Sequence, residues 1–140
     1  MAARHLITGR AGEDAALRHL TAKGFRVLAT NWRHGGLELD AVCAAPGTPD
    51  AGEEIVFVEV RTRGPGSLET PAESLTRAKM AKLVRAASEY LSRNDLWDRP
   101  CRFDLVSVRV TDHGFALEHI THAFDLTQAL GRGHAAWQPW

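Results

Sequence analysis

The sequence predicts one small α/β domain in which two helices cover a mixed β-sheet. Its 140 residues suit a single domain, and its hydrophobic fraction of 44% and charged fraction of 24% are ordinary for a globular protein. Apolar residues recur at helical spacing in two segments and alternate along five others. These segments follow the order helix, three strands, helix, two strands.

The first helix is expected to begin at Thr8, a candidate N-cap, and to end at Gly24, a candidate C-cap. Glu13 falls on the apolar face of this helix, or at its edge. A carboxylate in a first helical turn favours the helix N-terminus, which would explain Glu13 without a function. The apolar face itself comprises Ala16, Leu17 and Leu20.

Three strands are expected at 25–33, 37–44 and 54–63, with a tight turn at Gly35-Gly36 between the first two. The Pro/Gly-rich segment 45–54 is predicted to be a loop. The three strands are therefore expected to form an antiparallel meander.

The second helix, expected at 76–91, is followed by strands at 101–110 and 114–121. Residues 1–130 are predicted to form the domain, and residues 131–140 a flexible tail without periodicity. The apolar stripe of this helix consists of Met80, Leu83, Val84, Ala87, Tyr90 and Leu91.

Carboxylates interrupt the apolar pattern of the second and third strands. By strict alternation Glu38 and Asp40 share one face of the second strand, with Leu37, Leu39 and Ala41 on the other. In the third strand Glu59 and Arg61 share a face opposite a run of valines. Neighbouring strands lie about 4.8 Å apart, so the side chains of Asp40 and Glu59 are expected to converge.

Two interpretations of this convergence remain open. Asp40, Glu59 and Arg61 could form a partly buried salt-bridge cluster with a structural role only. Alternatively, Asp40 and Glu59 could bind a hard divalent cation such as Mg²⁺ or Mn²⁺, because such ions prefer carboxylate oxygens. A bound ion of this kind activates water and stabilises charge on a phosphate, as in metal-dependent nucleases.

The formal net charge is zero, with 17 Lys and Arg against 17 Asp and Glu, but the charges are unevenly distributed. Between residues 77 and 93 five basic residues face a single acidic one, Glu89. This basic stretch is either a solvated helix face or a surface that follows a phosphate backbone. The residues that we expect to contact nucleic acid are Arg63, Arg77, Lys79, Lys82 and Arg85.

Other candidate sites are weaker. His119 and His122 form an HxxH pair without a third ligand motif, and are better explained as structural or surface residues. Trp32 is either a core residue or a platform for base stacking. Asp104 lies within an expected strand, where we interpret it as an ion-pair partner of Arg102 or of a neighbouring arginine. No membrane span or secretory signal is recognisable, so we expect a cytoplasmic protein without a membrane partner.

Several motifs in order resemble the YraN-like family of small bacterial proteins: "GRAGEDAALRHLTAKGFRVLATNWR", "GGLELDAV", "VFVEVRTR", "TRAKMAKLVRAASEYL" and "RFDLVSV". That family is similar to the PD-(D/E)XK nucleases and to archaeal Holliday-junction resolvases. The resemblance implies a restriction-endonuclease-like three-layer fold, with about five strands in the order αβββαββ. It also implies DNA as the partner, and a homodimer.

The resemblance also implies roles for individual residues. Asp40 matches the metal-binding Asp of the superfamily, and Glu59 the acid of its "(D/E)xK" signature. Glu38 precedes Asp40 in the corresponding motif, and Glu13 matches a helix-one Glu near such sites. The family's lysine is replaced here by Arg61, which cannot act as a base at usable pH but can still bind a phosphate.

The sequence therefore predicts a nucleic-acid-binding protein with a nuclease-like fold, which could be a Mg²⁺- or Mn²⁺-dependent endodeoxyribonuclease. In that mechanism Asp40 and Glu59 hold the metal, Glu13 or Glu38 assists, and Arg61 contacts the scissile phosphate. The alternative is a binding module for nucleic acid or protein that has lost catalysis, because Arg61 replaces the motif lysine. A purely structural protein with a salt-bridged core is the third hypothesis.

Overall fold

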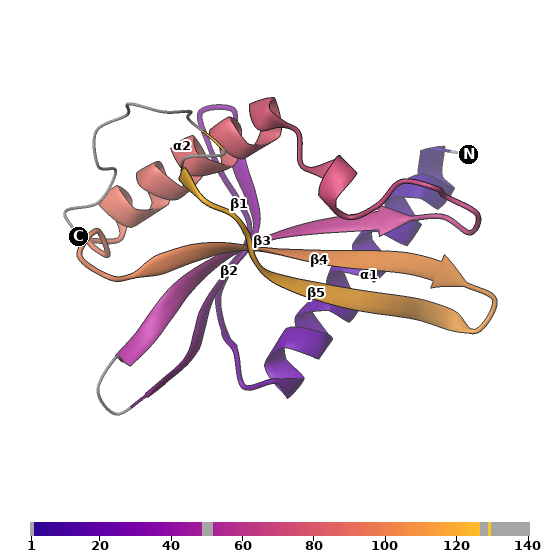
Figure 1. Cartoon of the computed structure of the whole chain (residues 1–140), viewed down its shortest axis with the longest axis horizontal. Helices are drawn as coiled ribbons and strands as arrows, with labels where there is room; N and C mark the ends of the chain where they lie inside the picture. Colours follow the sequence, from indigo (N-terminus) through magenta and orange to yellow (C-terminus); the bar gives the residue numbers. More distant parts are fainter. Residues whose placement is uncertain (1, 49–51, 127–128, 130–140) are drawn as a thin grey trace.

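The computed structural model describes residues 2–48, 52–126 and 129 (Figure 1). Its strands form one mixed sheet in the order β1-β2-β3-β4-β5, in which β3 and β4 are parallel and all other neighbours antiparallel. The strands are β1 (Arg26–His34), β2 (Leu37–Thr48), β3 (Gly52–Arg63), β4 (Cys101–Thr111) and β5 (Gly114–Phe124). The helices are α1 (Ala2–Ala22), the short 3₁₀ helix η1 (Ala72–Ser74) and α2 (Arg77–Arg93).

The expected order αβββαββ is confirmed, and the two helices cover opposite faces of the sheet (Figure 1). Side chains alternate along β3, so that Val56, Val58 and Val60 pack on the α1 side. Ile55 and Phe57 pack on the α2 side. The result is the three-layer α/β arrangement of a restriction-endonuclease-like domain. The predicted tail at 131–140 lies outside the described residues.

α1 is longer than the sequence pattern predicted. It begins at Ala2, so Thr8 lies inside the helix and is not its N-cap. Glu13 consequently lies near the middle of the helix, and the explanation by a first-turn carboxylate is wrong. Helix propagation through the favourable residues before Thr8 accounts for the difference.

The end of α1 agrees with the prediction. Gly24 has φ of +94°, and its N–H donates to the carbonyl of Thr21 at 3.0 Å, while the N–H of Phe25 donates to Leu20 at 3.1 Å. These two bonds form a Schellman cap, which requires a left-handed residue and so favours glycine. The cap turns the chain directly into β1.

The segment 45–54 is mostly strand, and not the loop that its composition predicted. β2 continues to Thr48 and β3 starts at Gly52, with an irregular register between Ala45 and Thr48. A side chain at Gly47 would lie 1.9 Å from the carbonyl oxygen of Gly52, so glycine permits a close approach of the two strands. Glycine at position 47 therefore allows β2 and β3 to continue as strands through this segment.

α2 connects the parallel strands β3 and β4. Thr76 is its N-cap and accepts a hydrogen bond from the N–H of Lys79 at 3.2 Å. The predicted apolar stripe faces the sheet, and its buried members include Val84, Tyr90 and Leu91. The opposite side of α2 is left for polar and basic residues.

Candidate functional site

The site begins where β2 separates from β3. Their ladder starts at the Ala41–Val58 pair. At the residue of β2 before this pair, the side chain of Asp40, and not a backbone carbonyl, accepts the hydrogen bond from β3. Asp40 Oδ2 accepts a hydrogen bond of 2.9 Å from the N–H of Val60. The Asp40 carboxylate therefore lies at the end of the β2–β3 ladder.

Side-chain alternation is interrupted at the same point. Leu39 packs in the core on the α2 side, whereas Ala41 packs in the core on the α1 side. The expectation that both residues share one face is therefore wrong, because the strand does not keep a regular pleat through Asp40. The convergence of Asp40 with Glu59 of β3 is nevertheless observed.

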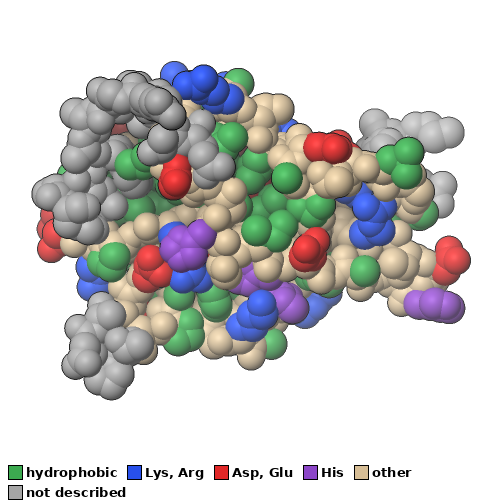
Figure 2. Space-filling view, in the orientation of Figure 1, with side chains coloured by type: hydrophobic (Ala, Val, Ile, Leu, Met, Phe, Trp, Pro, Cys, Tyr) green, Lys and Arg blue, Asp and Glu red, His purple; other side chains and the backbone are tan. Residues whose placement is uncertain are grey.

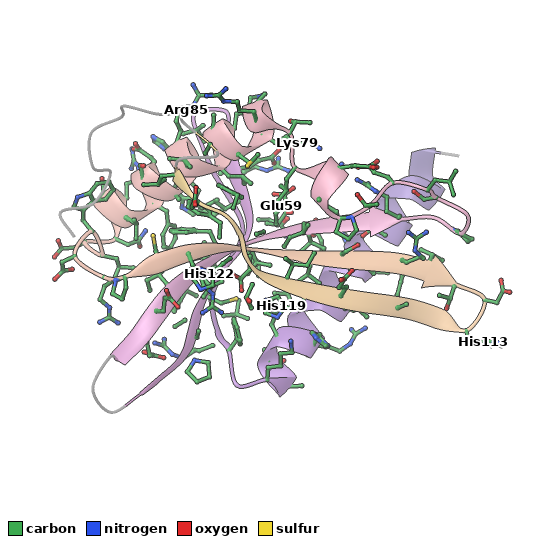
Figure 3. All side chains as sticks on the ribbon, in the orientation of Figure 1. Glu59, Lys79, Arg85, His113, His119 and His122 are labelled. Carbon is green, nitrogen blue, oxygen red and sulfur yellow. The ribbon has the colours of Figure 1, made fainter. Side chains whose placement is uncertain are left out.

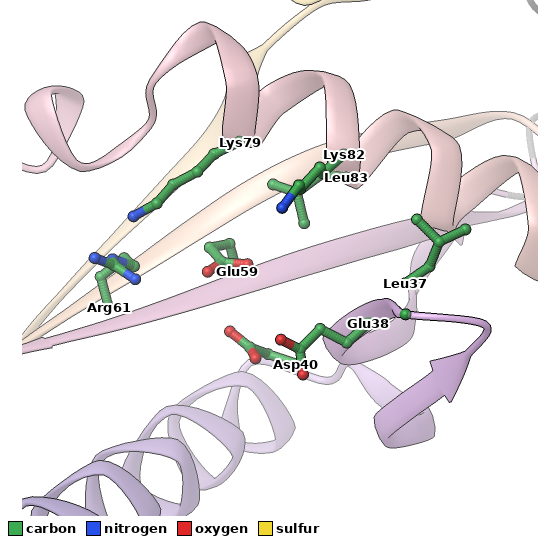
Figure 4. A pocket seen from close by; sticks show the side chains of 9 residues that line it. Leu37, Glu38, Asp40, Glu59, Arg61, Lys79, Lys82 and Leu83 are labelled. Atoms are coloured by element: carbon green, nitrogen blue, oxygen red, sulfur yellow. The ribbon is translucent and has the colours of Figure 1, made fainter.

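Asp40 and Glu59 line a cavity of about 230 Å³ between the sheet and α2, here called the central pocket (Figure 4). Carboxylates from β2 and β3 lie on one side of it, and basic side chains from β3 and α2 on the other. Its lining residues are Gly36, Leu37, Glu38, Asp40, Glu59, Arg61, Lys79, Lys82 and Leu83.

The environment of the two central acids favours a proton between them. Burial, with a contribution from the Asp40 carboxylate, raises the pKa of Glu59 to about 7. Burial also raises the pKa of Asp40, partly opposed by the N–H of Val60. Each of the two carboxyl groups influences the pKa of the other. Near neutral pH the pair therefore exchanges one proton readily, and a cation can replace it.

Arg61 does not neutralise this pair directly. It lines the central pocket, and its charge lowers the pKa of both acids. However, no ion pair within 4.0 Å joins it to Asp40 or Glu59 among the contacts of the described residues. Its Nε atom is buried, and no described residue is its hydrogen-bond partner. The direct salt-bridge cluster that the sequence allowed is thus absent from this part of the chain.

The five predicted nucleic-acid contacts occupy different environments. Lys79 and Lys82 line the central pocket, with Lys79 close to Glu59 (Figure 3). Arg85 points away from the sheet at the outer side of α2, where Figure 2 shows basic side chains at the edge of the molecule. Arg77 is exposed. Arg63 is ion-paired with Glu69 and its side chain is only 16% exposed.

Glu38 and Glu13 lie on different sides of Asp40. Glu38 reaches the central pocket, is exposed, and has a loose ion pair of 3.5 Å with Arg33. Glu13 instead lines a second cavity of about 670 Å³ on the α1 side, in which Asp40 also takes part. The site thus extends on both sides of the Asp40 carboxylate.

Asn31 is a member of this second cavity that sequence reasoning missed. It lies within β1 but has φ of +48°, and its side chain hydrogen-bonds to Glu13. Burial and the Asp40 carboxylate raise the pKa of Glu13, and the Asn31 contact opposes that shift. The sequence did hold one signal for Asn31. An asparagine is unusual inside a strand pattern, and it tolerates left-handed backbone.

The donor set of Asp40 and Glu59 fits a hard divalent cation. Burial raises the pKa of both carboxyl groups, and the neighbouring carboxylates add to this, Glu38 at Asp40 and Asp40 at Glu59. Such a pair would be stabilised if a cation displaced its proton. Within the described ranges no group of three or more His, Cys, Asp or Glu is arranged as a metal site. Asp40 and Glu59 would supply two carboxylates, a number that would suit Mg²⁺ because this ion usually keeps several waters.

A second buried acid shows how this fold stabilises a structural carboxylate. Asp104 of β4 is 2% exposed and accepts four hydrogen bonds. Arg102 donates two, and the side chain of His119 and the backbone of His122 donate one each. Arg102 also pairs with Glu54 at 2.7 Å. The predicted Asp104–Arg102 pair is confirmed, and His119 has a structural role.

The fold and the central pocket define a small three-layer α/β protein with two paired acids beside basic side chains. The chain belongs to the Uncharacterised protein family UPF0102, whose model matches residues 12–108. A UPF0102 protein of Nitratidesulfovibrio vulgaris strain DP4 is 51% identical over 99% of this chain and 98% of that protein. One from Oleidesulfovibrio alaskensis is 39% identical, covering 97% and 94%. One from Pelobacter propionicus is 41% identical, covering 85% and 83%.

These matches confirm the family resemblance inferred from the motifs. The wider placement among PD-(D/E)XK nucleases stays a prediction. No helix in the described part of the chain is long and apolar enough to cross a membrane.

Proposed function

We propose that this protein binds DNA at the central pocket and hydrolyses a phosphodiester bond there with the help of Mg²⁺ or Mn²⁺. The observation that carries the proposal is the contrast between its buried acids. Asp104 has every oxygen paired with donors of the chain, including an arginine. Asp40 and Glu59 have raised pKa values, and among the described residues no ion pair within 4.0 Å joins either of them to a basic neighbour. Buried carboxyl groups without direct ion pairs lower the stability of the folded protein. They therefore favour a ligand that binds between the carboxyl groups and the basic side chains of the pocket.

In this proposal the metal lies on the acidic side of the central pocket and the phosphate on its basic side. Asp40 and Glu59 would hold the cation, which when bound polarises a phosphate and activates water. Arg61, Lys79 and Lys82 lie on the other side of the pocket, where their charges attract phosphate oxygens.

Individual residues of the chain orient the site. The N–H of Val60 fixes the Asp40 carboxylate through a 2.9 Å hydrogen bond. Arg61 remains protonated, so it stabilises negative charge on the phosphate and does not accept a proton. Asp40 and Glu59 would give up the proton that they share in order to hold a cation. Glu13, on the other side of Asp40, is a candidate proton acceptor for a substrate that extends into the second cavity.

The second candidate function is DNA binding without cleavage at the same pocket. Arg61 favours it, because an arginine that cannot lose a proton replaces the lysine of the signature. A variant with Arg61→Lys distinguishes the two functions, since it restores the family residue while keeping a positive charge.

DNA binding can be tested through its dependence on salt. Each phosphate contact contributes a slope of about 0.9 in log K against log salt for duplex DNA. We expect Lys82→Gln to weaken binding and to lower this slope by about one contact. Arg85→Gln is the matched control on the outer side of α2, and its effect should be smaller. Equal binding by the wild type and by Lys82→Gln, with equal slopes, would refute the assignment of the pocket to phosphate.

A further inference from the structure

The second cavity, on the α1 side of Asp40, is larger than the central pocket, and the proposed hydrolysis uses little of it. Its volume of about 670 Å³ lies in the range of small-molecule sites. Its apolar lining consists of Leu17 of α1, Ala41 of β2 and Val60 of β3. Hydroxyl, amide, carboxyl and guanidinium groups make up most of the remaining lining. The cavity therefore combines an apolar surface with many groups that form hydrogen bonds.

Asn31 lines this cavity because β1 is irregular at that residue. Thr30 and Asn31 are consecutive and both line the cavity, whereas consecutive side chains of a regular strand point to opposite faces. The left-handed φ of Asn31, +48°, interrupts the alternation. Because Thr30 pairs with Ala41, Asn31 lies beside Asp40 of β2. Residues with strained backbone of this kind cluster at sites that bind ligands.

The polar lining is rich in hydrogen-bond acceptors. α1 contributes the carboxyl groups of Glu13 and Asp14, and β1 contributes the amide of Asn31, which both accepts and donates. Asp14 and Asn31 are exposed and Glu13 is half-buried, so a ligand can reach them. Carboxyl groups outnumber arginines in the lining, which does not favour an anion within the cavity. An uncharged ring with donors at its edge suits this lining better.

Arg33 connects the second cavity with the central pocket. It lines the second cavity, and its Nε lies 3.5 Å from Oε2 of Glu38, which lines the central pocket. The two side chains are 76% and 67% exposed, so their ion pair is weak and a phosphate can replace Glu38. Asp40 lines both cavities. A nucleic-acid strand with one phosphate in the central pocket can therefore continue past Asp40, with its next phosphate at Arg33.

We propose that the second cavity binds one unpaired base, carrying an exocyclic amino group, from the nucleotide next to the scissile phosphate. The inference rests on the function proposed above and specifies its substrate class, DNA with an unpaired nucleotide at the cleavage site. Leu17, Ala41 and Val60 contact the face of the base, and Asn31 and Glu13 contact its edge. The amino groups of adenine and cytosine donate to amide and carboxylate oxygens, and thymine has no such group. In an intact duplex the base is paired and stacked, so its entry costs free energy.

The test compares an intact 30-base-pair duplex with three duplexes that carry one extra nucleotide in the labelled strand. This nucleotide is an adenine, a thymine or an abasic site. Binding is measured by fluorescence anisotropy in EDTA, so that no cleavage occurs. The abasic duplex controls for the bending that any extra nucleotide introduces. The wild type should bind the adenine duplex about tenfold more tightly than the abasic duplex, with the thymine duplex between them.

Asn31→Gly is the variant that tests the base contact. It removes the amide, and glycine adopts the left-handed backbone of this position without strain. The variant should lose most of the preference for adenine and bind the intact duplex as the wild type does. Asn94→Gly, the same change at the C-cap of α2, is the matched control and should keep the preference. Melting temperatures establish that both variants are folded.

Arg33→Gln tests the path between the two cavities independently of the base contact. It should weaken binding of every duplex with an extra nucleotide and lower the salt slope by about one phosphate contact, while the ratio of adenine to abasic affinity stays the same. Arg18→Gln, with the same change of charge at an exposed position of α1, is the matched control and should keep the slope. An unchanged slope in Arg33→Gln would contradict the proposed path.

The remaining outcomes separate this inference from the proposed function. Equal binding of the adenine, thymine and abasic duplexes by the wild type would refute the base site while DNA binding stands. Thymine bound as tightly as adenine would refute the recognition of an amino group. A preference for adenine that survives in Asn31→Gly would place the base outside the second cavity. If the wild type binds none of the duplexes, the proposed function itself fails.

Discussion

The carboxylate of Asp40 accepts a hydrogen bond from the backbone N–H of Val60 at 2.9 Å, at the point where β2 separates from β3. One side chain therefore does two things. It replaces a missing ladder bond, and it positions an acid against Glu59 inside the pocket. Removal of Asp40 is therefore expected to affect both the stability of the fold and the chemistry of the pocket, so the two effects have to be measured separately.

The first prediction concerns that separation. Asp40→Ala leaves the N–H of Val60 without its partner, which costs about 1–3 kcal/mol of unfolding free energy. Asp40→Asn keeps an acceptor oxygen and should lose much less. Urea denaturation at pH 5 measures the difference, since Glu59 is protonated there and carboxylate repulsion is small. Equal stability of the two variants would contradict the role given to this hydrogen bond.

The second prediction concerns pH. The pKa of Glu59 is about 7 in the folded protein, against 4.5 for an ordinary glutamate. The folded state thus binds more protons between these values, so stability falls as pH rises through this window. Glu59→Gln removes the ionisation. It should match the wild type near pH 4.5 and exceed it by up to about 3 kcal/mol above pH 7.

Denaturation of both proteins at a series of pH values tests this prediction. A wild type that stays as stable as Glu59→Gln at pH 8 would show that the carboxyl titrates normally.

The fold could largely be predicted from the sequence because apolar periodicity is a local signal. The valines of β3 and the apolar stripe of α2 indicated both element type and buried face. The start of α1 was missed because a possible N-cap at Thr8 competes with helix propagation. The antiparallel pairing of β2 with β3 was predicted, but the extension of both strands into 45–54 was missed, because Gly47 looks like a loop residue and instead permits a close approach of the strands.

The site was harder to predict because its details depend on contacts distant in sequence. Alternation placed Asp40 near Glu59, and the structure confirms that they meet. Alternation could not show the separation of the strands at Asp40, the ion pair of Arg63 with Glu69, or the contact between Asn31 and Glu13. Each of these joins residues of different elements or of a loop, where periodicity carries no information.

The third prediction concerns metal binding. Mn²⁺ at about 100 times its dissociation constant should stabilise the folded protein by about 2.7 kcal/mol. At one fixed Mn²⁺ concentration the stabilisation should be larger at pH 8 than at pH 6, because the ion competes with the proton on the Asp40–Glu59 pair and its dissociation constant rises at low pH. Thermal melts measure it.

Two substitutions serve as controls for the melts. Glu59→Gln should lose most of the Mn²⁺ effect. Asp104→Asn, which alters a buried acid outside the pocket, should be less stable but keep the shift. A shift that survives in Glu59→Gln would place the ion elsewhere.

The most direct test of the central claim is cleavage of labelled duplex, nicked and four-way-junction DNA in Mn²⁺. The wild type is compared with Asp40→Asn, which should keep the fold, and with Arg61→Lys. We predict cleavage by the wild type and its loss in Asp40→Asn, with faster cleavage by Arg61→Lys. Cleavage by Arg61→Lys alone would mean that the pocket binds DNA without cutting it. Absence of cleavage in every variant, or cleavage that persists in Asp40→Asn, would contradict the assignment of hydrolysis to the Asp40–Glu59 pair.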